Sequence, residues 1–459
     1  MTTPSQPTTG RAEESQARGI ASSPSDYAWN VNFNNGNANY NHQNNNGRVR
    51  AVRSVSAPAA GEYQGATQGD VSLRDLHAAW QRARRQKVPS HNQLQFESQW
   101  IDGLLGLQQQ INAGRWKPLA TTCFIATKPK ARQIHAPDFA DRIVHHWLVP
   151  QLEAIYEPGF IHHSYANRIG KGTHSAVTAL RGMVRQVHSG QGGGWYLQLD
   201  IRNFFNSVHR PTLYRMLKQR MQRRGVSIEA QRVVHALLRQ SVERQGVVHR
   251  STAAERSRVP PHKRLENAAP GCGLPVGNLS SQFFANVYLD ALDQFVKHIL
   301  RASRYVRYVD DFVLIHRSRD QLQQWQDQIT TFLRDTLQLE LKADIRLRPL
   351  TDGIDFLGYV TYPTHTRVRR RVVQHASTAL AAWHCAHHTT AGIRCTPGEL
   401  RHLGSIWASY RGHFARADTW RLQQLFHARH PWLAPLTTIQ RRFDHRIEGQ
   451  RITLRISCG

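Results

Sequence analysis

Acidic residues are scarce in this chain of 459 residues, and long apolar runs are missing. Lys and Arg number 60 against 32 Asp and Glu, which gives a formal charge of +28. A chain this basic is attracted to polyanions, either nucleic acid or an anionic membrane surface. No apolar run reaches the ~18 residues of a membrane-spanning helix, and the first residues contain no signal-peptide core. The composition therefore favours nucleic acid as the partner and excludes a membrane.

Cysteine is also scarce: the five cysteines are too few and too scattered for a disulfide framework in a chain of this length. Such usage is typical of a reducing compartment, so we expect the protein in the cytoplasm. The His- and Cys-containing stretch 384–395 matches no zinc-binding spacing, and a surface helix end with a loop is the favoured interpretation there. The hydrophobic content of 40% is enough to fill a core, which indicates a globular chain.

Patterning divides the chain into three parts. Residues 1–70 are polar and predict a disordered segment, in which ten of the eighteen residues from 30 to 47 are Asn. Residues 71–365 mix helical and strand periodicity, and 366–459 predict basic helices. We expect one long helix at 280–300, a single strand at 354–362 and an exposed loop at 245–269. The fold class that follows is α+β.

Three carboxylates stand where predicted strands end. Asp200 follows the apolar run 195–199, while Asp310 and Asp311 join two β-rich runs in a predicted hairpin. Asp is common in turns, so a pair of them there is usually turn chemistry. Mg²⁺, however, prefers hard oxygen ligands, and nucleotidyl transfer uses two such ions held close together. A strand-terminal Asp beside an Asp-Asp hairpin, in a chain this basic, therefore indicates a two-metal site.

The sequence resembles reverse transcriptases through a series of motifs in the family's order. The first carboxylate motif matches Asp-Ile-Arg-Asn-Phe-Phe at 200–205, the template motif matches 273–282, and the catalytic box matches Tyr-Val-Asp-Asp at 308–311. Upstream, 128–137 is similar to the finger hairpin and 141–146 to the helix behind it. Downstream, Asp-Phe-Leu-Gly-Tyr at 355–359 resembles the primer-side strand. The resemblance spans about residues 115–365, and a whole series of motifs in order is far more specific than any single one.

The resemblance implies a right-hand polymerase with fingers and palm over 71–365, an antiparallel palm sheet, and a helical thumb over 366–459. It implies two Mg²⁺ ions, with Mn²⁺ as a substitute, and as partners an RNA template, an RNA/DNA duplex, dNTPs and a small basic accessory protein. The implied metal-site residues are Asp200, Ile201, Asp310 and Asp311, of which the three Asp are catalytic. The implied dNTP-binding residues are Lys130, Arg132, Phe205, Val276, Gly277 and Gln282.

Some of these assignments have simple alternatives. Lys130 and Arg132 also fit a solvated basic turn. Phe205 matches the ring that excludes a ribose 2′-hydroxyl, although core packing is the alternative and the better interpretation for neighbouring Phe204. Lys342 matches the proton donor to pyrophosphate only loosely, because its register departs from the family motif.

Within the family, the sequence resembles the enzymes of diversity-generating retroelements. Val276 stands where most reverse transcriptases have Gln, and Gln282 where most have Pro; 164–166 and 170–174 also resemble that group, although His163 replaces its usual Asp. Loss of the Gln side chain removes a hydrogen-bonding group near the nascent pair, which predicts weaker discrimination against mismatches. The resemblance implies that such errors fall opposite template adenines. The Asn-rich tract agrees, because Asn codons begin with two adenines; a translated template repeat and an ordinary polar tail are both open interpretations.

Several alternatives remain at this point. A retron-like, group II intron-like or defence-associated reverse transcriptase would share the same motifs without targeted mutagenesis; no maturase or endonuclease motif follows the polymerase motifs, which disfavours the intron type. A basic RNA-binding protein on an inactive polymerase fold is disfavoured by the intact Asp200, Asp310 and Asp311. An RNA-dependent RNA polymerase is disfavoured by the ring of Phe205.

Overall fold

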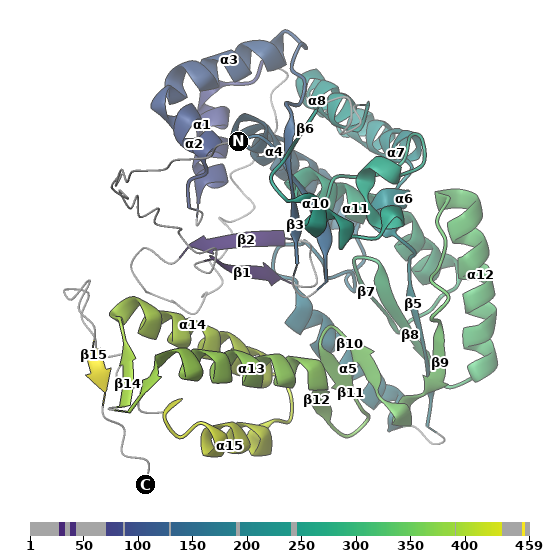
Figure 1. Cartoon of the computed structure of the whole chain (residues 1–459). Coiled ribbons are helices and arrows are strands. Elements are labelled where there is room, and N and C mark those ends of the chain that lie inside the picture. The colour runs from purple at the N-terminus through teal and green to yellow at the C-terminus, as the bar shows by residue number, and fades with distance from the viewer. Residues whose placement is uncertain are drawn as a thin grey trace, which may run out of the picture.

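The computed structural model describes residues 27–32, 37–42, 70–85, 88–127, 130–189, 193–239, 246–390, 392–433 and 452–454. Figure 1 shows the arrangement of its elements. In the Asn-rich segment, strand β1 (Tyr27–Asn32) pairs with β2 (Asn37–His42) as an antiparallel hairpin. The other residues before 70 lie outside the described residues, so the disorder expected for 1–70 stays a prediction.

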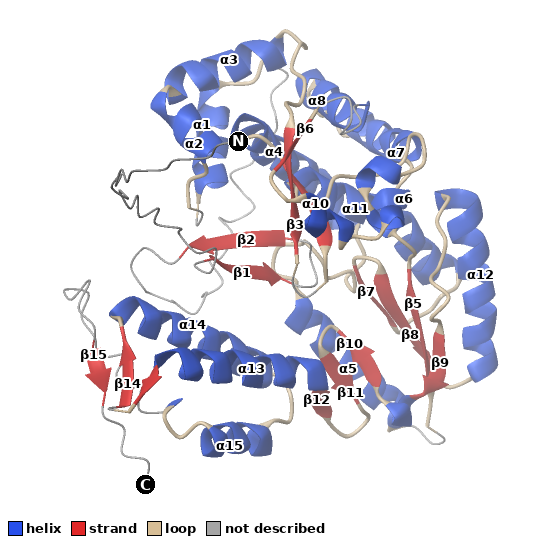
Figure 2. Ribbon diagram, in the orientation of Figure 1, coloured by secondary structure: helices blue, strands red, loops and turns tan. Residues whose placement is uncertain are grey.

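The predicted carboxylates lie on a four-stranded sheet with the order β7-β8-β5-β9, in which every pairing is antiparallel (Figure 2). Its strands are β5 (Trp195–Asp200), β7 (Tyr305–Tyr308), β8 (Asp311–His316) and β9 (Arg346–Pro349). Aromatic and β-branched residues dominate β7 and β8, which favours extended backbone. All residues of β7 and the middle of β5 and β8 are buried. The antiparallel palm sheet is therefore confirmed.

Helices pack against this sheet. Helix α12 (Arg319–Leu337) lies along β5, β8 and β9, and α5 (Thr173–His188) packs against β7 and β8. The apolar residues of α12 recur at helical spacing, and its N-terminus is capped by Ser318, whose hydroxyl accepts the N–H of Gln321 over 3.2 Å. Helix α11 (Leu279–Gln294) continues into the π-helical turn η5 (Phe295–Ile299). The single helix predicted for 280–300 is thus helical up to Ile299 but changes its hydrogen-bond pattern after Gln294.

The fingers combine helices with a sheet of order β4-β3-β6. The sheet strands are β3 (Thr121–Ala126), β4 (Arg132–Ala136) and β6 (Val247–His249). The helices of this part and of the adjoining palm are α1 (Leu73–Arg84), α2 (His91–Ser98), α3 (Trp100–Asn112), α4 (Phe139–Tyr156), η2 (Glu157–Gly159), α6 (Phe204–Ser207), α7 (Arg210–Arg223) and α8 (Ile228–Arg239). Helix α4 is mostly buried and contacts both α1 and α11, so it joins the fingers to the palm.

The segment 245–269 is mostly exposed, as expected in its described residues, but the expectation of an irregular loop was wrong. The segment holds β6, which pairs in parallel with β3, and then α10 (Ala253–Ser257), η3 (Pro261–Lys263) and η4 (Leu265–Asn267). Helix α10 begins with a capping box, in which Thr252 and Glu255 satisfy each other's backbone N–H groups. The capping box of α10 and the pairing of β6 with the distant strand β3 stabilise a segment whose sequence has no hydrophobic periodicity.

The single strand predicted at 354–362 is instead a hairpin. Strands β10 (Ile354–Phe356) and β11 (Tyr359–Thr361) pair across Leu357 and Gly358, which have φ of 54° and 89°. Two consecutive positive φ values are the signature of a type I′ turn, whose twist matches that of paired strands. Strand β12 (Thr366–Val368) completes this sheet, and the short helix η6 (Leu350–Asp352) precedes it.

The C-terminal part is helical, as expected, with α13 (Arg370–His387), α14 (Pro397–Phe414) and α15 (Trp420–Arg429). A small sheet accompanies the helices: β13 (His388–Thr389), β14 (Gly392–Cys395) and β15 (Ile452–Leu454). Trp383, Trp407 and Phe414 are buried, so these aromatic residues serve packing. Among the helices of the described residues, none combines the length and apolar character that a bilayer crossing needs.

Candidate active site

The ends of two neighbouring palm strands bring the three predicted carboxylates together. Asp200, the last residue of β5, pairs in register with Asp311, the first residue of β8. Beyond the sheet, the backbone N–H of Ile201 donates to the carbonyl of Asp310 over 3.2 Å. The structure therefore places Asp200, Asp310 and Asp311 at one edge of the palm sheet, with Ile201 beside them.

The turn between β7 and β8 has a strained backbone. Only Val309 and Asp310 lie between the paired residues Tyr308 and Asp311. Val309 has φ of 56°, in the left-handed region. A β-branched residue rarely adopts this conformation, which costs on the order of 1–3 kcal/mol. Contacts around the turn must therefore hold it in place.

Negative charge is concentrated at this edge. Burial and then the neighbouring Asp200 raise the pKa of Asp310 above its ordinary value. Burial also raises the pKa of Asp311 to about 7, and Asp200 and Asp310 add to that effect. The side-chain amide of Gln198 works in the opposite direction, since it donates to Asp311 Oδ1 over 3.2 Å. Carboxylates whose pKa is raised in this way gain from a nearby cation.

The donor set fits a hard divalent cation. Asp200 Oδ1 is buried and has no hydrogen-bond partner, which is unfavourable for a carboxylate oxygen unless a cation or donor satisfies it. Within the part of the chain that the structure describes, no three His, Cys, Asp or Glu side chains converge on one ion-sized space. Magnesium at nucleotide sites is usually held by one or two carboxylates together with substrate phosphates. Asp200, Asp310 and Asp311 fit that type of site.

Lys342 lies directly against this edge. Its Nζ is 2.5 Å from Asp200 Oδ2, and its backbone N–H donates to the Asp200 carbonyl over 2.8 Å. Both side chains are partly exposed, with 46% of Lys342 and 34% of Asp200 accessible. This placement suits a proton donor at the site and equally a charge partner of Asp200.

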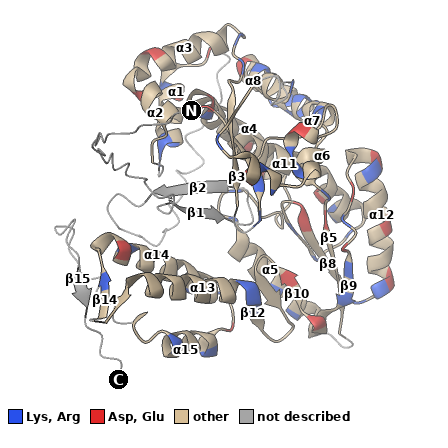
Figure 3. Cartoon of the chain, in the orientation of Figure 1, with Lys and Arg blue, Asp and Glu red and all other residues tan. Residues whose placement is uncertain are grey.

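Basic residues from several separate segments lie near the carboxylate edge. Lys130 lies in the connection between β3 and β4, of which residues 128–129 lie outside the described residues, and Arg132 is the first residue of β4. The pKa of Lys130 is lowered, first by burial and then by the positive charges of Lys263, Arg371, Lys342 and Arg132. Sequence patterns singled out Lys130, Arg132 and Lys342 but missed Lys263 in η3 and Arg371 in α13. Figure 3 shows the basic residues spread over the elements around the palm.

Lys263 belongs to a segment fastened on two sides. The side-chain amide of Asn203, three residues after Asp200, donates to the carbonyl of His262 over 2.6 Å. The N–H of Leu265 donates to the side-chain oxygen of Gln133, next to Arg132, over 2.8 Å. The segment therefore links the palm turn after β5 to the finger strand β4. No local pattern predicts this, because both partners are distant in sequence.

The template motif docks on the same finger strand. The N–H of His135 in β4 donates to the carbonyl of Val276 over 2.8 Å. Gly277 follows with φ of 128°, and a Cβ there would lie 2.8 Å from the carbonyl oxygen of His135. Only Gly allows this approach of the two backbones. Gln282 lies in the first turn of α11 and is buried.

The two adjacent phenylalanines of the first carboxylate motif occupy different environments. Phe204 is buried in the core, as predicted, whereas Phe205 is only partly buried and packs at the edge of the core. The carbonyl of Phe205 accepts the N–H of Leu274 over 2.7 Å. Phe205, the last residue of the Asp200 motif, thus contacts the template motif directly.

Known proteins are similar in sequence to this part of the chain. The sequence model of the family described as reverse transcriptase (RNA-dependent DNA polymerase) matches residues 125–360, just over half of the chain, and that range contains the three carboxylates. Protein YkfC of Escherichia coli (strain K12) is 22% identical over 306 residues, covering 58% of this chain and 71% of that protein. The group II intron-encoded protein LtrA of Lactococcus lactis subsp. cremoris is 22% identical over 328 residues, covering 57% of this chain.

The similarities differ in extent. This chain spans about half the length of LtrA, since the matched region is 49% of that protein. A solved structure of telomerase from Candida albicans with a fragment of telomeric RNA aligns at 10% identity, over 72% of this chain and 62% of the telomerase chain. The TM-score of 0.37 is too low for that likeness to support an inference.

Proposed function

Because the chain belongs to the reverse transcriptase family, whose enzyme class is RNA-directed DNA polymerase, we propose that its palm extends a primer with dNTPs on an RNA template by two-metal nucleotidyl transfer. The observation that carries this mechanism is the register of β5 and β8, which sets Asp200 opposite Asp311 with Asp310 in the adjoining turn. The cytoplasm, where dNTPs and RNA meet, is the compartment we propose.

Each residue of the site has a task in this proposal. Asp200, Asp310 and Asp311 hold the metal ions, with the backbone of Ile201 beside them. Bound Mg²⁺, or Mn²⁺ in its place, would activate the primer 3′-hydroxyl and neutralise the departing pyrophosphate. Lys342 gives its proton to the pyrophosphate, for which its position beside Asp200 is suitable.

The nucleotide itself is held by the surrounding residues. The cations Lys130 and Arg132 attract its triphosphate, and an Arg offers two parallel donors to a phosphate. Phe205 excludes a ribose 2′-hydroxyl and thereby selects dNTPs. Val276 and Gly277 lie where the template motif meets the finger strand, and Gln282 follows in the first turn of α11. In this proposal all three are near the nascent base pair.

Within the family, we propose the error-prone type found in diversity-generating retroelements. Val276 supports this proposal, because an aliphatic side chain offers no hydrogen bond to a base pair, so discrimination against a mismatch weakens. Such an enzyme is expected to act with a structured RNA and a small basic accessory protein. The charge of +28 favours binding of the RNA, but it gives no support for the basic protein. A group II intron-like enzyme is the alternative, since the group II intron-encoded protein LtrA is one of the relatives. Retron-like and defence-associated enzymes are further alternatives.

Primer extension with product sequencing tests the subtype. The full chain is given a defined RNA template, dNTPs and Mg²⁺, with and without the proteins encoded next to it. We expect DNA whose errors concentrate opposite template adenine, and we expect the Val276→Gln variant to reduce that excess. Faithful DNA from the wild-type chain would contradict the mutagenic proposal and favour the group II intron-like, retron-like or defence-associated alternative.

The Asn-rich tract offers an independent test of the same proposal. If the tract at 30–47 is a translated template repeat, a neighbouring gene should contain a similar nucleotide sequence that differs chiefly at positions where the repeat has adenine. A genome region without any such copy would contradict that interpretation and leave an ordinary polar tail.

A further inference from the structure

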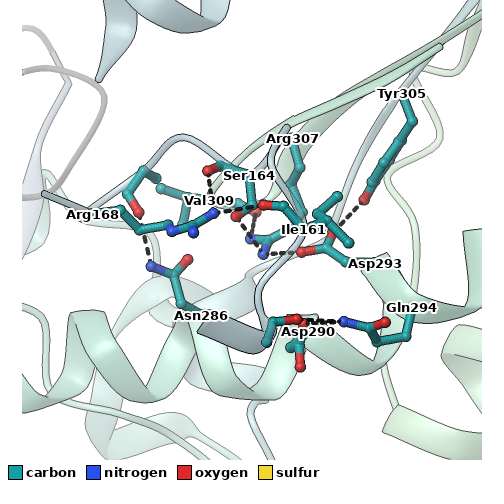
Figure 4. Close-up of polar contacts among 12 residues, drawn as sticks. Ile161, Ser164, Arg168, Asn286, Asp290, Asp293, Gln294, Tyr305, Arg307 and Val309 are labelled. Carbon is teal, nitrogen blue, oxygen red and sulfur yellow. Dashed lines mark hydrogen bonds and ion pairs between the residues drawn. The ribbon is translucent and has the colours of Figure 1, made fainter. Parts of the chain in front are cut away.

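A fully buried ion pair lies behind the catalytic turn and has no part in the roles given above. The side chain of Arg307 in β7 is 1% exposed and that of Asp293 in α11 is 0% exposed (Figure 4). Arg307 Nη2 lies 2.5 Å from Asp293 Oδ2, and Arg307 Nε donates to Asp293 Oδ1 over 2.7 Å. The hydroxyl of Tyr305 donates to the same Asp293 oxygen over 2.8 Å. Both carboxylate oxygens of Asp293 thus accept hydrogen bonds, and the two bonds from Arg307 hold the guanidinium in one orientation.

In that orientation, Arg307 also reaches the catalytic turn. Its Nη1 donates to the carbonyl oxygen of Val309 over 3.0 Å. This carbonyl belongs to the peptide that joins Val309 to Asp310, and a peptide is planar, so its orientation sets the direction of the Asp310 backbone. Val309 is the residue with the strained positive φ. The guanidinium is therefore in direct contact with the peptide that must be held against its intrinsic preference.

The network extends to the segments 164–166 and 170–174, which resemble diversity-generating retroelement enzymes. The Ser164 hydroxyl accepts from Arg307 Nη2 over 2.9 Å, while the backbone N–H and carbonyl of Arg307 bond to His163 and Tyr165, each over 3.0 Å. On the other side of the strand, the Thr173 hydroxyl donates to the hydroxyl of Tyr308 over 3.3 Å. Segments 163–166 and 170–174 therefore both border β7 just before the Asp-Asp pair.

We propose that Arg307, oriented by Asp293 and Ser164, is a positioning residue for the polymerase reaction: it fixes the Val309–Asp310 peptide and thereby the direction in which the Asp310 and Asp311 carboxylates face the nucleotide. The inference rests on the proposed function of that site and adds the group that aligns it. If Arg307 only stabilised the fold, its ion pair with Asp293 would be sufficient. The additional bond to the Val309 carbonyl acts on the turn that carries Asp310.

The test uses two variants of the full chain. Arg307→Lys keeps the positive charge for Asp293 but cannot reach Asp293, Ser164 and the Val309 carbonyl together, because an ammonium lacks the planar fork of a guanidinium. Ser164→Ala removes one hydrogen bond to Arg307 and leaves the ion pair intact. This variant should therefore still fold if Arg307→Lys does not. The control is Ile329→Ala in α12, a fully buried core residue outside the network, which reports on destabilisation alone.

Two measurements separate alignment from stability. In single-nucleotide incorporation, Arg307→Lys should lower kcat by about 10- to 100-fold while the KM for dNTP stays within about twofold, because misplacement of reacting groups acts on the chemical step. Ser164→Ala should lower kcat in the same direction by a few-fold. In metal-free protein, amide hydrogen exchange should accelerate in 308–312 in both variants and remain unchanged in the rest of the palm.

The outcomes distinguish this inference from the proposed function. If Arg307→Lys loses no more activity than Ile329→Ala at a comparable loss of melting temperature, or if exchange rises evenly over the whole palm, the pair is only structural and the inference fails. If the wild-type chain makes no DNA under any condition, the proposed function fails, while faster exchange confined to 308–312 would still show that Arg307 fixes the turn.

Discussion

Two ion pairs lie close to the carboxylate edge, and they differ in their access to water. The pair of Lys342 with Asp200 is partly exposed, at 46% and 34% of the side chains. The pair of Arg307 with Asp293 is sealed, at 1% and 0%. The first pair includes one of the proposed metal ligands, whereas the second lies one layer behind the proposed ligands Asp310 and Asp311.

This difference in exposure separates an exchangeable contact from a fixed one. An ion pair in contact with water contributes little to stability, so Asp200 can change partners at low cost. A buried pair is different, because removal of one partner leaves an uncompensated charge in the interior. One side of the site is thus adjustable and the other rigid, as expected where substrates and cations come and go beside a fixed scaffold.

The largest expected effect is a loss of activity when Asp200, the acidic residue of the exposed pair, is replaced. Asp200→Asn should lower primer extension by about a thousandfold, because loss of a ligand charge removes several kcal/mol of transition-state stabilisation. Stability should change by less than about 1 kcal/mol, since the pair is partly solvated. Extension rates and urea denaturation of the same preparation measure both. A variant that keeps near wild-type activity would remove Asp200 from the site.

Breaking the buried pair should act on stability first. Asp293→Asn leaves the Arg307 charge in the interior, and we expect the free energy of unfolding to fall by about 3–5 kcal/mol. Urea denaturation followed by circular dichroism measures this fall. Asp335→Asn is the matched control, because Asp335 pairs with Arg334 on the surface of α12 and should unfold at the wild-type urea concentration. Equal urea midpoints for Asp293→Asn and Asp335→Asn would contradict the distinction between the buried and the exposed pair.

Removing the basic partner of Asp200 gives an intermediate effect. Lys342→Met should lower kcat by about a hundredfold if Lys342 donates the proton to pyrophosphate, as general acids contribute at least that much. Arg334→Met, an exposed basic residue of α12, is the control. A loss of less than about twofold would leave Lys342 as a charge partner of Asp200 only.

The smallest effect concerns salt. Raising ionic strength from 0.1 M to 1 M shortens the screening length from about 10 Å to about 3 Å. The stability difference between wild type and Lys342→Met, below about 1 kcal/mol at the start, should disappear at high salt. The difference between wild type and Asp293→Asn should persist, because water and ions do not reach that pair. Parallel denaturation series at both salt concentrations provide the measurement.

The carboxylate edge was predictable from sequence because its signals are local. Asp200 ends an apolar strand, and Asp310 with Asp311 interrupts two β-rich runs, so both boundaries can be seen without a structure. The ordered sheet and the helical C-terminal part followed from periodicity for the same reason. Their strand-end positions and the basic charge also indicated a metal site, whereas their assignment to a polymerase reaction came from resemblance to a family.

The supporting contacts were not predictable, because their partners are far apart in sequence. Arg307 was read only as part of a strand, although a charged residue in an otherwise apolar strand of four residues is itself a sign of a buried partner. Strand β6 within 245–269 needed β3 to be recognised. Lys263 in η3 and Arg371 in α13 come near Lys130 through tertiary structure alone.

The most direct test of the central claim compares wild type with Asp310→Asn in primer extension on an RNA template, with dNTPs and Mg²⁺, and with any accessory protein that the wild-type chain requires. We predict DNA from the wild type, no DNA when EDTA is added, and no detectable DNA from Asp310→Asn with an unchanged circular dichroism spectrum. Comparable DNA synthesis by Asp310→Asn, or synthesis by the wild type that EDTA does not affect, would contradict a metal-dependent polymerase built on these carboxylates.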